Sequence, residues 1–397
     1  MTKTKVAYRF IFISHKMPSI TIVNRHYPPN PGITGESAWD LANYLIEKHG
    51  FEVRVVHVER NDLGGGQLRQ PVGETFAVPT IYKGKNGILK LVAGFFDGFF
   101  LILKTRRVRK GVVICLTSPP LLPLWAGWLL GKRWVLWSMD LFPEGFAADG
   151  LIKTNNPVYG LVRWLAYRRA PTALIALGPN QAAQVQQNYG QKLPTIVLPC
   201  GVLLNQPRDA AQPDWRKNNG KIYFGYCGNL GDAHSADFLR LFIQHFDSER
   251  HHLVLAIYGT KASEVLLLAE KRAGISILKN VPRSQLHFID VHLVSLLTKW
   301  THIAVPSKAM SSICAGGAVL FCGSQEADTW VLLQEASWLV AEQGDLETQL
   351  SLFLNQITPQ AVDQKKATAQ QVAQRLRAQV VTAYEAIAQL DGSPLNV

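Results

Sequence analysis

Short apolar runs alternate with helical patterns along the chain, and the alternation occurs in both halves. Four to eight β-branched or aromatic residues bounded by turn residues are typical of a buried strand, whereas apolar spacings of three and four residues indicate a helix. Strands that alternate with helices favour an α/β fold with parallel sheets. The predicted strands are Arg9–Ser14, Glu52–Val58, Val112–Leu116, Trp134–Trp137, Ala173–Ala176, Thr195–Leu198, Ile222–Tyr226, Leu253–Tyr258, Val291–Leu296, Val319–Phe321 and Trp338–Val340.

Helices are predicted between these strands and at the end of the chain. In Ser37–His49, the apolar residues Ala38, Leu41 and Leu45 share one face at helical spacing. A final helix, about Ala367–Leu390, carries an apolar stripe that we expect to pack back across the first half of the chain.

The length of 397 residues is too great for one ordinary core and suits two domains of about 150–200 residues each. The polar stretch 204–220 contains Pro, Asn and Gly and is the best candidate for a linker. We therefore predict an N-terminal domain over 1–203, a linker over 204–220, a C-terminal domain over 221–366 and a returning helix in 367–397.

The chain is basic, with 41 Lys and Arg against 29 Asp and Glu and a net charge of +12. This balance favours anionic partners such as phosphates or acidic lipid headgroups, and no nucleic-acid-binding module is recognisable. The five cysteines are scattered without a CxxC motif or a metal-ligand spacing. They are typical of buried, reduced thiols in a cytoplasmic protein, and no metal site is predicted.

One apolar segment suggests contact with a membrane. Residues 88–103 are interrupted by Lys90 and Asp97 and are followed by a basic cluster that begins at Lys104. An apolar face beside basic residues is the pattern of a peripheral contact with an anionic membrane surface, here the inner face. A core helix followed by a solvated turn explains the same residues, so both interpretations stay open. No segment reaches the roughly 18–20 apolar residues that span a bilayer.

Two glycine-rich turns have the chemistry of a phosphate site. Pro306 and Ser307 open a helix of small residues, with Ser at the cap, and Gly316-Gly317 ends it. The unpaired N–H groups and partial positive charge of a helix N-terminus suit a phosphate. Earlier, a predicted strand leads into Gly228-Asn229-Leu230-Gly231, just past the linker, and a helix Ala236–His245 follows. Amide groups of such a turn also suit a diphosphate.

Two further segments place polar or glycine residues where ligands bind in α/β sheets. Asp140 directly follows a predicted strand, at the edge where ligand-facing groups of open parallel sheets lie. It suits a hydrogen bond to a hydroxyl group, or alternatively a helix cap. A Pro/Gly-rich turn ending at Gly35 precedes the Ser37 helix, where glycine permits close approach of the backbone to a ligand.

These segments together resemble the retaining glycosyltransferases of family 4. Pro306-Ser307-Lys308 resembles the family's Pro-Ser-Lys-x-x-Glu element, and residues 228–231 resemble its Gly-Asn-Leu-Gly donor loop. Residues 140–144, Asp-Leu-Phe-Pro-Glu, resemble its Asp-Leu-Trp-Pro-Glu element. Residues 27–35 resemble its N-terminal glycine loop, and residues 199–202 its Pro-Asn-Gly-Val turn, which is interpreted as structural.

The resemblance implies a GT-B fold, in which two Rossmann-like doubly wound domains face a cleft and a C-terminal helix crosses back. It implies metal-independent, retaining transfer of a hexose-type sugar from a nucleotide diphosphate sugar to a glycan or polyprenyl-linked acceptor, without a cofactor. Asp140 and Lys308 are the predicted catalytic residues. The predicted donor-binding residues are Gly35, Gly228, Asn229, Gly231, His234, Lys261, Pro306, Ser307 and Ser311.

Three positions depart from the family pattern. Ser311 and Ile303 stand where relatives commonly carry Glu, and Asp232 follows the donor loop where relatives often carry a cation. Loss of a charge-assisted hydrogen bond of about 1.5–3 kcal/mol at Ser311 predicts roughly tenfold to hundredfold weaker binding. Lys308, Lys261 and His234 are the candidate replacement cations, and His302 is a candidate sugar contact.

These departures motivate an alternative function, a catalytically weakened GT-B protein that acts as a partner in a glycan-assembly complex. A nucleotide-sugar epimerase is disfavoured because no convincing set of acidic and His residues for proton transfer is apparent. A nicotinamide oxidoreductase is weaker still, since the glycine turn comes late and lacks a ribose-binding acid at the usual spacing.

Overall fold

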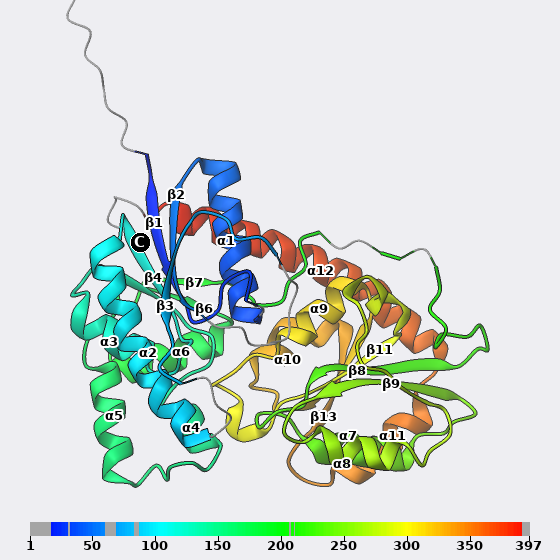
Figure 1. The fold of residues 1–397 in the computed structure, drawn as a ribbon. Helices are drawn as coiled ribbons and strands as arrows, with labels where there is room; N and C mark the ends of the chain where they lie inside the picture. Colours follow the sequence, from blue (N-terminus) through cyan, green and yellow to red (C-terminus); the bar gives the residue numbers. More distant parts are fainter. Residues whose placement is uncertain are drawn as a thin grey trace, which may run out of the picture.

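The computed structural model describes residues 17–30, 32–59, 69–82, 87–205, 208–209 and 211–390, with only the backbone of residues 87–91. Two parallel sheets lie side by side (Figure 1). The first has seven strands in the order β3-β2-β1-β4-β5-β6-β7, and the second has six in the order β10-β9-β8-β11-β12-β13. The predicted α/β architecture with two Rossmann-like halves is confirmed.

The N-terminal half supplies the first sheet and its helices. Its strands are β1 (Ser19–Val23), β2 (Glu52–Glu59), β3 (Glu74–Pro79), β4 (Val112–Leu116), β5 (Trp134–Trp137), β6 (Ala173–Ala176) and β7 (Thr195–Val197). Its helices are α1 (Ile33–His49), α2 (Gly87–Val108), α3 (Leu122–Leu129), α4 (Glu144–Ala148), α5 (Pro157–Tyr167) and α6 (Pro179–Tyr189).

The C-terminal half follows after the polar connection. Its strands are β8 (Ile222–Asn229), β9 (His251–Tyr258), β10 (Ile275–Ile277), β11 (Val291–Ser295), β12 (Ala318–Gly323) and β13 (Ser337–Ala341). Its α-helices are α7 (Ala236–His245), α8 (Ala262–Ala269), α9 (Ser307–Ala315), α10 (Asp328–Leu333), α11 (Leu346–Gln356) and α12 (Pro359–Ala388). Three short 3-10 helices are η1 (Arg283–Phe288), η2 (Thr298–Trp300) and η3 (Gln334–Ala336).

The differences from the predicted elements lie mainly at the ends of the chain and at the sheet edges. The predicted strand Arg9–Ser14 lies outside the described residues, and the first described strand is β1. The strands β1, β3 and β10 were not predicted. β3 and β10 are edge strands, whereas β1 lies inside the first sheet between β2 and β4. The final helix begins at Pro359 rather than Ala367, because Thr358 caps its first turn by accepting a hydrogen bond from the Ala361 N–H.

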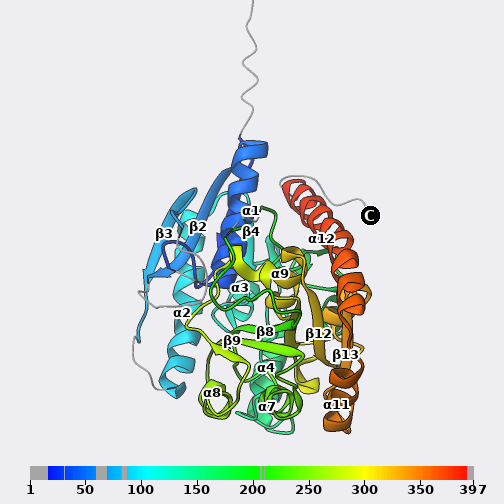
Figure 2. The same ribbon diagram turned by 90° about the vertical axis from the view of Figure 1, so that its right-hand side faces the viewer.

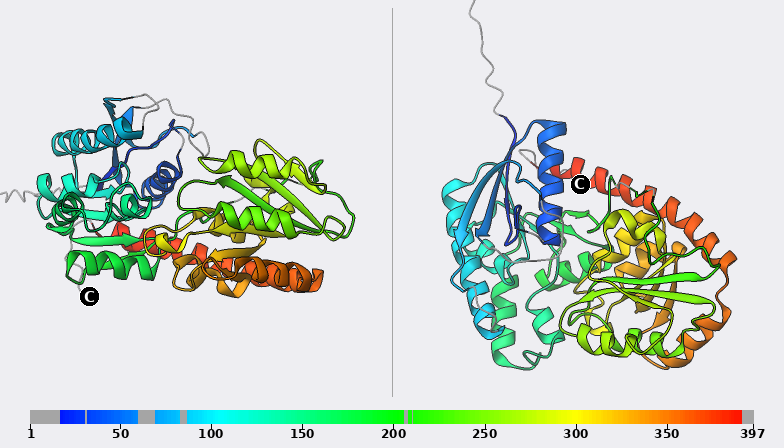
Figure 3. Two further views of the ribbon diagram at one scale, coloured as in Figure 1. Left: turned by 90° about the horizontal axis from the view of Figure 1, so that it is seen from below. Right: turned by 45° about the vertical axis from the view of Figure 1, so that its right-hand side comes forward.

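The helix α12 carries the chain from the second sheet back to the first (Figures 1 and 3). Its residues Leu376, Val380, Tyr384 and Ile387 are buried, as the predicted stripe requires. It contacts α9 in the second half and α1 in the first, and Figure 2 shows α12 along one edge of the molecule with its C-terminal end near α1. One hydrophobic cluster includes residues of both halves and of α12, so the halves share part of their core.

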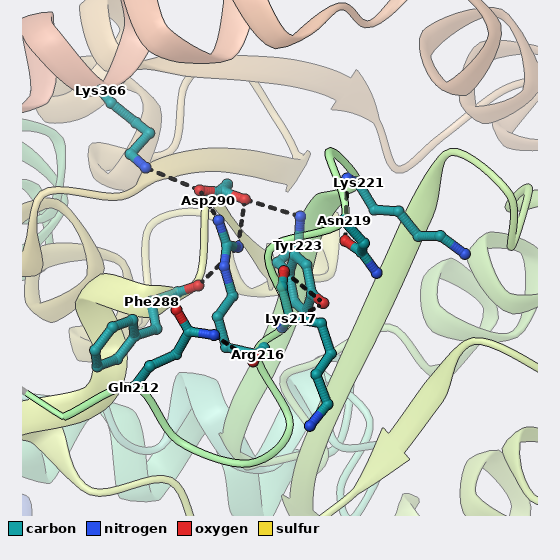
Figure 4. A network of polar contacts seen from close by, with 9 residues as sticks. All are labelled: Gln212, Arg216, Lys217, Asn219, Lys221, Tyr223, Phe288, Asp290 and Lys366. Carbon is teal, nitrogen blue, oxygen red and sulfur yellow. Dashed lines mark hydrogen bonds and ion pairs between the residues drawn. The ribbon is translucent and has the colours of Figure 1, made fainter.

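A buried carboxylate anchors α12 and the connecting segment to the second sheet (Figure 4). Asp290, at the start of β11, accepts hydrogen bonds from Arg216 Nη1 at 2.7 Å, Lys366 Nζ at 2.8 Å and the Tyr223 N–H at 2.9 Å. Burial acts to raise the pKa of Asp290, but the charges of Lys366 and Arg216 hold it below its usual value. The carboxylate therefore stays ionised and joins the connecting segment, β8, β11 and α12.

Candidate functional site

A cleft of about 1730 Å³ lies between the two halves. Its walls include α1, the loops that follow β5, β8 and β11, and the first turn of α9. The strands β8 and β11 are neighbours in the second sheet, and connections leave them toward opposite edges. A crevice at such a switch in strand order is where open parallel sheets bind ligands. The predicted residues that line the cleft are Asp140, Gly228, Asn229, Gly231, His234, Pro306, Ser307, Lys308 and Ser311.

The glycine turn at the end of β8 forms one wall of the cleft. Gly228 has φ of 120°, a conformation that favours glycine, and a Cβ there would meet no atom within 4 Å. The turn packs closely on Gly259, where a Cβ would lie 2.2 Å from Asn229 Oδ1. Gly228 and Gly231 line the cleft, so the backbone of the turn is accessible to a ligand.

The N-terminus of α9 meets this turn. Pro306 rather than Ser307 occupies the N-cap position, and no side chain caps the helix. The predicted cap by the Ser307 hydroxyl is thus wrong, because Ser307 is already the first helical residue. The first-turn N–H groups of a helix without a side-chain cap are available to an anion, and Pro306, Ser307 and Lys308 line the cleft.

The side chain of Lys308 bridges α9 and the glycine turn. Its Nζ donates hydrogen bonds to Tyr226 Oη at 2.7 Å and to the Asn229 carbonyl at 2.8 Å. The ammonium also lies 4.0 Å from the centre of the Tyr226 ring. Burial lowers the pKa of Lys308 to about 7, with a small opposing effect from Cys227. A lysine that is only about half protonated at neutral pH in the empty cleft gains charge when an anion binds beside it.

The structure corrects the predicted roles of His234 and Lys261 as cations. His234 Nδ1 lies 2.6 Å from the Ser295 carbonyl oxygen, and burial together with the charge of Lys308 lowers the pKa of His234 to about 3. His234 is therefore neutral, with the ring proton on Nδ1, and supplies no positive charge. Lys261 is not among the cleft-lining residues. Its Nζ donates to the Asp232 and His234 carbonyls at 2.9 and 2.7 Å and so supports the turn from behind.

Carboxylates from both halves face the cleft. Asp140 lies on the N-terminal side, where the surrounding protein and Asp149 raise its pKa to about 6. Asp149 also lines the cleft, and its Oδ1 has no hydrogen-bond partner among the described residues. On the opposite wall, Asp232 Oδ1 accepts a hydrogen bond from Thr260 at 2.9 Å, which holds this carboxylate against the β9–α8 turn. No group of three or more metal-ligating side chains occurs in the described part of the chain.

The remaining predicted positions have mainly structural contacts. Ser311 Oγ donates to the Gly201 carbonyl at 2.8 Å, so it joins the two halves at the edge of the cleft. Gly35 lies in the first turn of α1, where a Cβ would come within 3.0 Å of the His26 backbone.

Ile303 is buried in the core, and its carbonyl accepts from the Leu141 N–H at 3.1 Å. His302 pairs with Glu326 and does not line the cleft.

Three contributions to the site were not predicted. Tyr226, which orients Lys308, lies two residues before Gly228 on β8, and strand alternation would have placed it on the same face. Asp149 carried no recognisable signal. Arg283 of η1 and Glu36 of α1 form a salt bridge at 2.6 Å that connects the two halves, and both residues line the cleft. Their separation of 247 residues leaves no local pattern in the sequence.

Comparison with known proteins agrees with this geometry. No family model matches the chain. The probable glycosyltransferase WbjE of Pseudomonas aeruginosa is 27% identical over 286 residues, which cover 66% of this chain and 70% of WbjE.

Solved structures share the fold over nearly the whole chain. WaaG, a glycosyltransferase involved in lipopolysaccharide biosynthesis, has a TM-score of 0.63 and 14% identity, with 94% of this chain and 100% of WaaG covered. Anabaena HepE in complex with UDP and glucose has a TM-score of 0.63 and 15% identity, with 94% and 98% covered. The similarity in sequence to WbjE, together with the GT-B fold of these structures, identifies the chain as a glycosyltransferase.

Proposed function

We propose that the chain is a retaining, metal-independent glycosyltransferase similar to those of family 4. It transfers a hexose-type sugar from a nucleotide diphosphate sugar to a glycan or lipid-carrier acceptor. The observation that carries the proposal is the convergence of Lys308, the Gly228–Gly231 turn and the α9 N-terminus on one wall of the cleft. HepE, of the same fold, is in complex with UDP and glucose, which supports a nucleotide sugar as the donor.

In this proposal the diphosphate lies on the turn and the helix terminus. The bond between the anomeric carbon and the diphosphate oxygen breaks while the acceptor hydroxyl oxygen bonds to the same face of that carbon. The acceptor proton passes to the departing diphosphate oxygen, so a separate nucleophile is not required. Protonated Lys308 stabilises the negative charge that develops on the diphosphate.

In this proposal Asp140 orients the acceptor. It belongs to the N-terminal half and lines the same cleft as Lys308 and the glycine turn. A carboxylate there accepts a hydrogen bond from a sugar hydroxyl and holds the attacking oxygen in position. Asp232 is a smaller obstacle to a diphosphate than its sequence position indicates, because Thr260 and the nearby charge of Lys261 hold its carboxylate.

The first test is binding of nucleoside diphosphates to the purified chain. We expect UDP, GDP, ADP or TDP to raise the melting temperature by several degrees, with the same shift in EDTA. Lys308→Met should weaken binding of that nucleotide about tenfold or more, by removing a charge-assisted contact.

Lys365→Met provides a matched control. Lys365 also donates to a backbone carbonyl, that of Glu335 at 2.9 Å, and lies near an aromatic ring, Trp338 at 5.8 Å, but it does not line the cleft. Its loss should leave nucleotide affinity unchanged. If no nucleotide alters a cooperative melting transition, the proposal is wrong. Once a donor and acceptor are found, the anomeric configuration of the product by NMR tests retention, and an inverted product would refute that part.

A further inference from the structure

The helix α5 presents an apolar stripe to solvent. Val158, Leu161 and Trp164 are 58%, 56% and 52% exposed, and their spacing of three residues places them along one side of the helix. Single exposed apolar residues are ordinary, but a contiguous stripe of large ones marks an interaction surface. The stripe was not predicted from the sequence, in which the predicted membrane contact was residues 88–103, a part of α2.

The neighbouring helices extend this stripe. Trp128 of α3 is 37% exposed, and its indole N–H donates to the Leu165 carbonyl of α5 at 3.1 Å. The helix α2 packs along α3 and exposes Val92, Phe96 and Phe100 at a spacing of four residues. Figure 1 shows α2, α3 and α5 gathered on the side of the molecule away from the second sheet. We call Val92, Phe96, Phe100, Trp128, Val158, Leu161 and Trp164 the outer helix surface.

The segment that contains the outer helix surface is strongly basic. Residues 87–170 hold twelve Lys and Arg and four Asp and Glu, a net charge of +8 out of +12 for the chain. The four acidic residues have other contacts or line the cleft. Asp97 is buried against Arg25, Glu144 pairs with Arg163, and Asp140 and Asp149 line the cleft.

Arginines lie directly beside the exposed tryptophans. The Arg168 guanidinium lies 5.5 Å from the Trp164 ring centre, and that of Arg169 lies 4.4 Å from the Trp128 ring centre. Tryptophan is favoured at the level of lipid headgroups, and arginine beside it reaches phosphate oxygens. Apolar side chains, interfacial aromatics and an excess of positive charge together match the chemistry of an anionic bilayer surface.

We propose that the outer helix surface docks the protein on an anionic lipid bilayer, with the side chains of α5 and α3 entering the headgroup region. The contact is peripheral, since none of the helices in the described residues is long and apolar enough to cross a membrane. The surface belongs to the N-terminal half, which also carries the cleft-lining Asp140 and Asp149. If the proposed function holds, docking keeps this half at the bilayer that carries a lipid-linked acceptor.

Co-sedimentation of the full chain with lipid vesicles tests the docking. We expect binding to vesicles that contain phosphatidylglycerol, little binding to pure phosphatidylcholine, and weaker binding at high salt. Leu161→Ser combined with Trp164→Ser should reduce binding at least about tenfold, through lost apolar burial. Arg168→Gln combined with Arg169→Gln should reduce binding to the anionic vesicles.

A matched double variant separates this surface from general hydrophobicity. Leu267 of α8 and Leu352 of α11 are 62% and 52% exposed but belong to the C-terminal half. Leu267→Ser with Leu352→Ser should leave vesicle binding unchanged. Absence of binding by the wild-type chain, equal binding to both lipids, or equal loss in the two double variants would each overturn the proposal. So would self-association without lipid that Leu161→Ser with Trp164→Ser abolishes, because it would assign the surface to a protein partner.

The vesicle experiment needs no nucleotide and no acceptor. Nucleotide-induced melting shifts measured on the same variants should remain at the wild-type value, because α5 and α3 carry no donor contact. If the chain does not bind vesicles but nucleotides still raise its melting temperature, the docking proposal is refuted and the proposed function stands. If the chain binds anionic vesicles but no nucleotide alters its melting temperature, the proposed function is refuted and the docking surface stands.

Discussion

The ammonium of Lys308 lies 2.8 Å from the backbone carbonyl oxygen of Asn229, so the first turn of α9 is joined to the glycine turn through one titratable group. Burial lowers the pKa of Lys308 to about 7. Roughly half of the molecules therefore carry this charge at neutral pH while the cleft is empty. A bound diphosphate favours the protonated form and raises this pKa.

Nucleoside diphosphate binding should therefore take up a proton. The terminal phosphate is fully ionised above about pH 7, so Lys308 governs the pH dependence from pH 7 to 9. We expect the dissociation constant to rise about tenfold per pH unit in this range, because the bound state holds more protons than the free state. Calorimetry in buffers of different ionisation enthalpy measures the uptake. Lys308→Arg should abolish the dependence, since arginine stays protonated. A flat profile in the wild-type chain would contradict the prediction.

Asp140→Asn should change stability and activity in opposite directions. The folded-state pKa of about 6 exceeds the ordinary value of 3.8, so the folded chain binds more protons than the unfolded chain between these values. Stability is then lost as pH rises through this window, and the cost is fully present at pH 7. The amide removes this cost and should raise the melting temperature at pH 7 but not at pH 3.5.

The same variant should lose transfer activity. Loss of the carboxylate that orients the acceptor hydroxyl should lower kcat/KM by about a hundredfold or more, and kcat/KM of the wild-type chain should fall below about pH 6. Asp237→Asn is the control, because Asp237 is an exposed carboxylate of α7 that pairs with Arg240. An Asp140→Asn enzyme with wild-type kcat/KM would exclude Asp140 from the reaction.

Local patterns predicted most strands of both sheets but missed β1 and the edge strands β3 and β10. Central strands such as β4 and β12 are covered on both faces, so their apolar residues form continuous runs. The edge strand β3, with sequence Glu-Thr-Phe-Ala-Val-Pro, is largely exposed and carries a mixed pattern. β10 has only three residues. Neither contains enough buried residues to distinguish it from a loop.

In the candidate site, features that depend on neighbouring residues in the sequence were predicted, and features that depend on contacts between distant residues were not. The glycine turn and Lys308 were predicted because each belongs to a short motif at the end of a strand or the start of a helix. The neutral state of His234 was not, since it depends on burial and on the carbonyl of Ser295, 61 residues away. Contacts between the halves, such as that of Ser311 with Gly201, depend on packing of the whole chain.

Removing Arg283 from its salt bridge with Glu36 should destabilise the protein more than removing the charge of Glu36. Glu36 is buried and Arg283 is 28% exposed in its side chain. Arg283→Met deprives a buried carboxylate of this guanidinium and should lower the free energy of unfolding by up to about 3 kcal/mol. Glu36→Gln should cost less, because the partly exposed Arg283 side chain keeps access to water.

Denaturant unfolding measures both variants. The control is Arg375→Met, which removes an exposed pair with Glu335 and should cost less than about 0.5 kcal/mol. Equal effects of Arg283→Met and Arg375→Met would show that the contact between the halves adds no more than an exposed pair.

The carboxylate of Asp328 caps a helix that belongs to the other half of the molecule. It accepts hydrogen bonds from the N–H groups of Asn180 at 2.9 Å and Gln181 at 2.8 Å, in the first turn of α6. Asp328→Ala leaves both groups unsatisfied and should lower the free energy of unfolding by about 2 kcal/mol. Gly178→Ala should act similarly, because a Cβ there would lie 2.2 Å from Asp328 Cγ.

Asp345→Ala distinguishes this cap from an ordinary one. Asp345 accepts from the Thr348 N–H at 3.0 Å and caps α11 within its own half. Its loss should lower stability by about 1 kcal/mol without changing how the two halves are held. We therefore expect broader small-angle scattering distance distributions and weaker nucleotide affinity in Asp328→Ala and Gly178→Ala, and neither effect in Asp345→Ala. If all three variants scatter like the wild-type chain, the Asp328 cap contributes to stability alone and the shared core holds the two halves together.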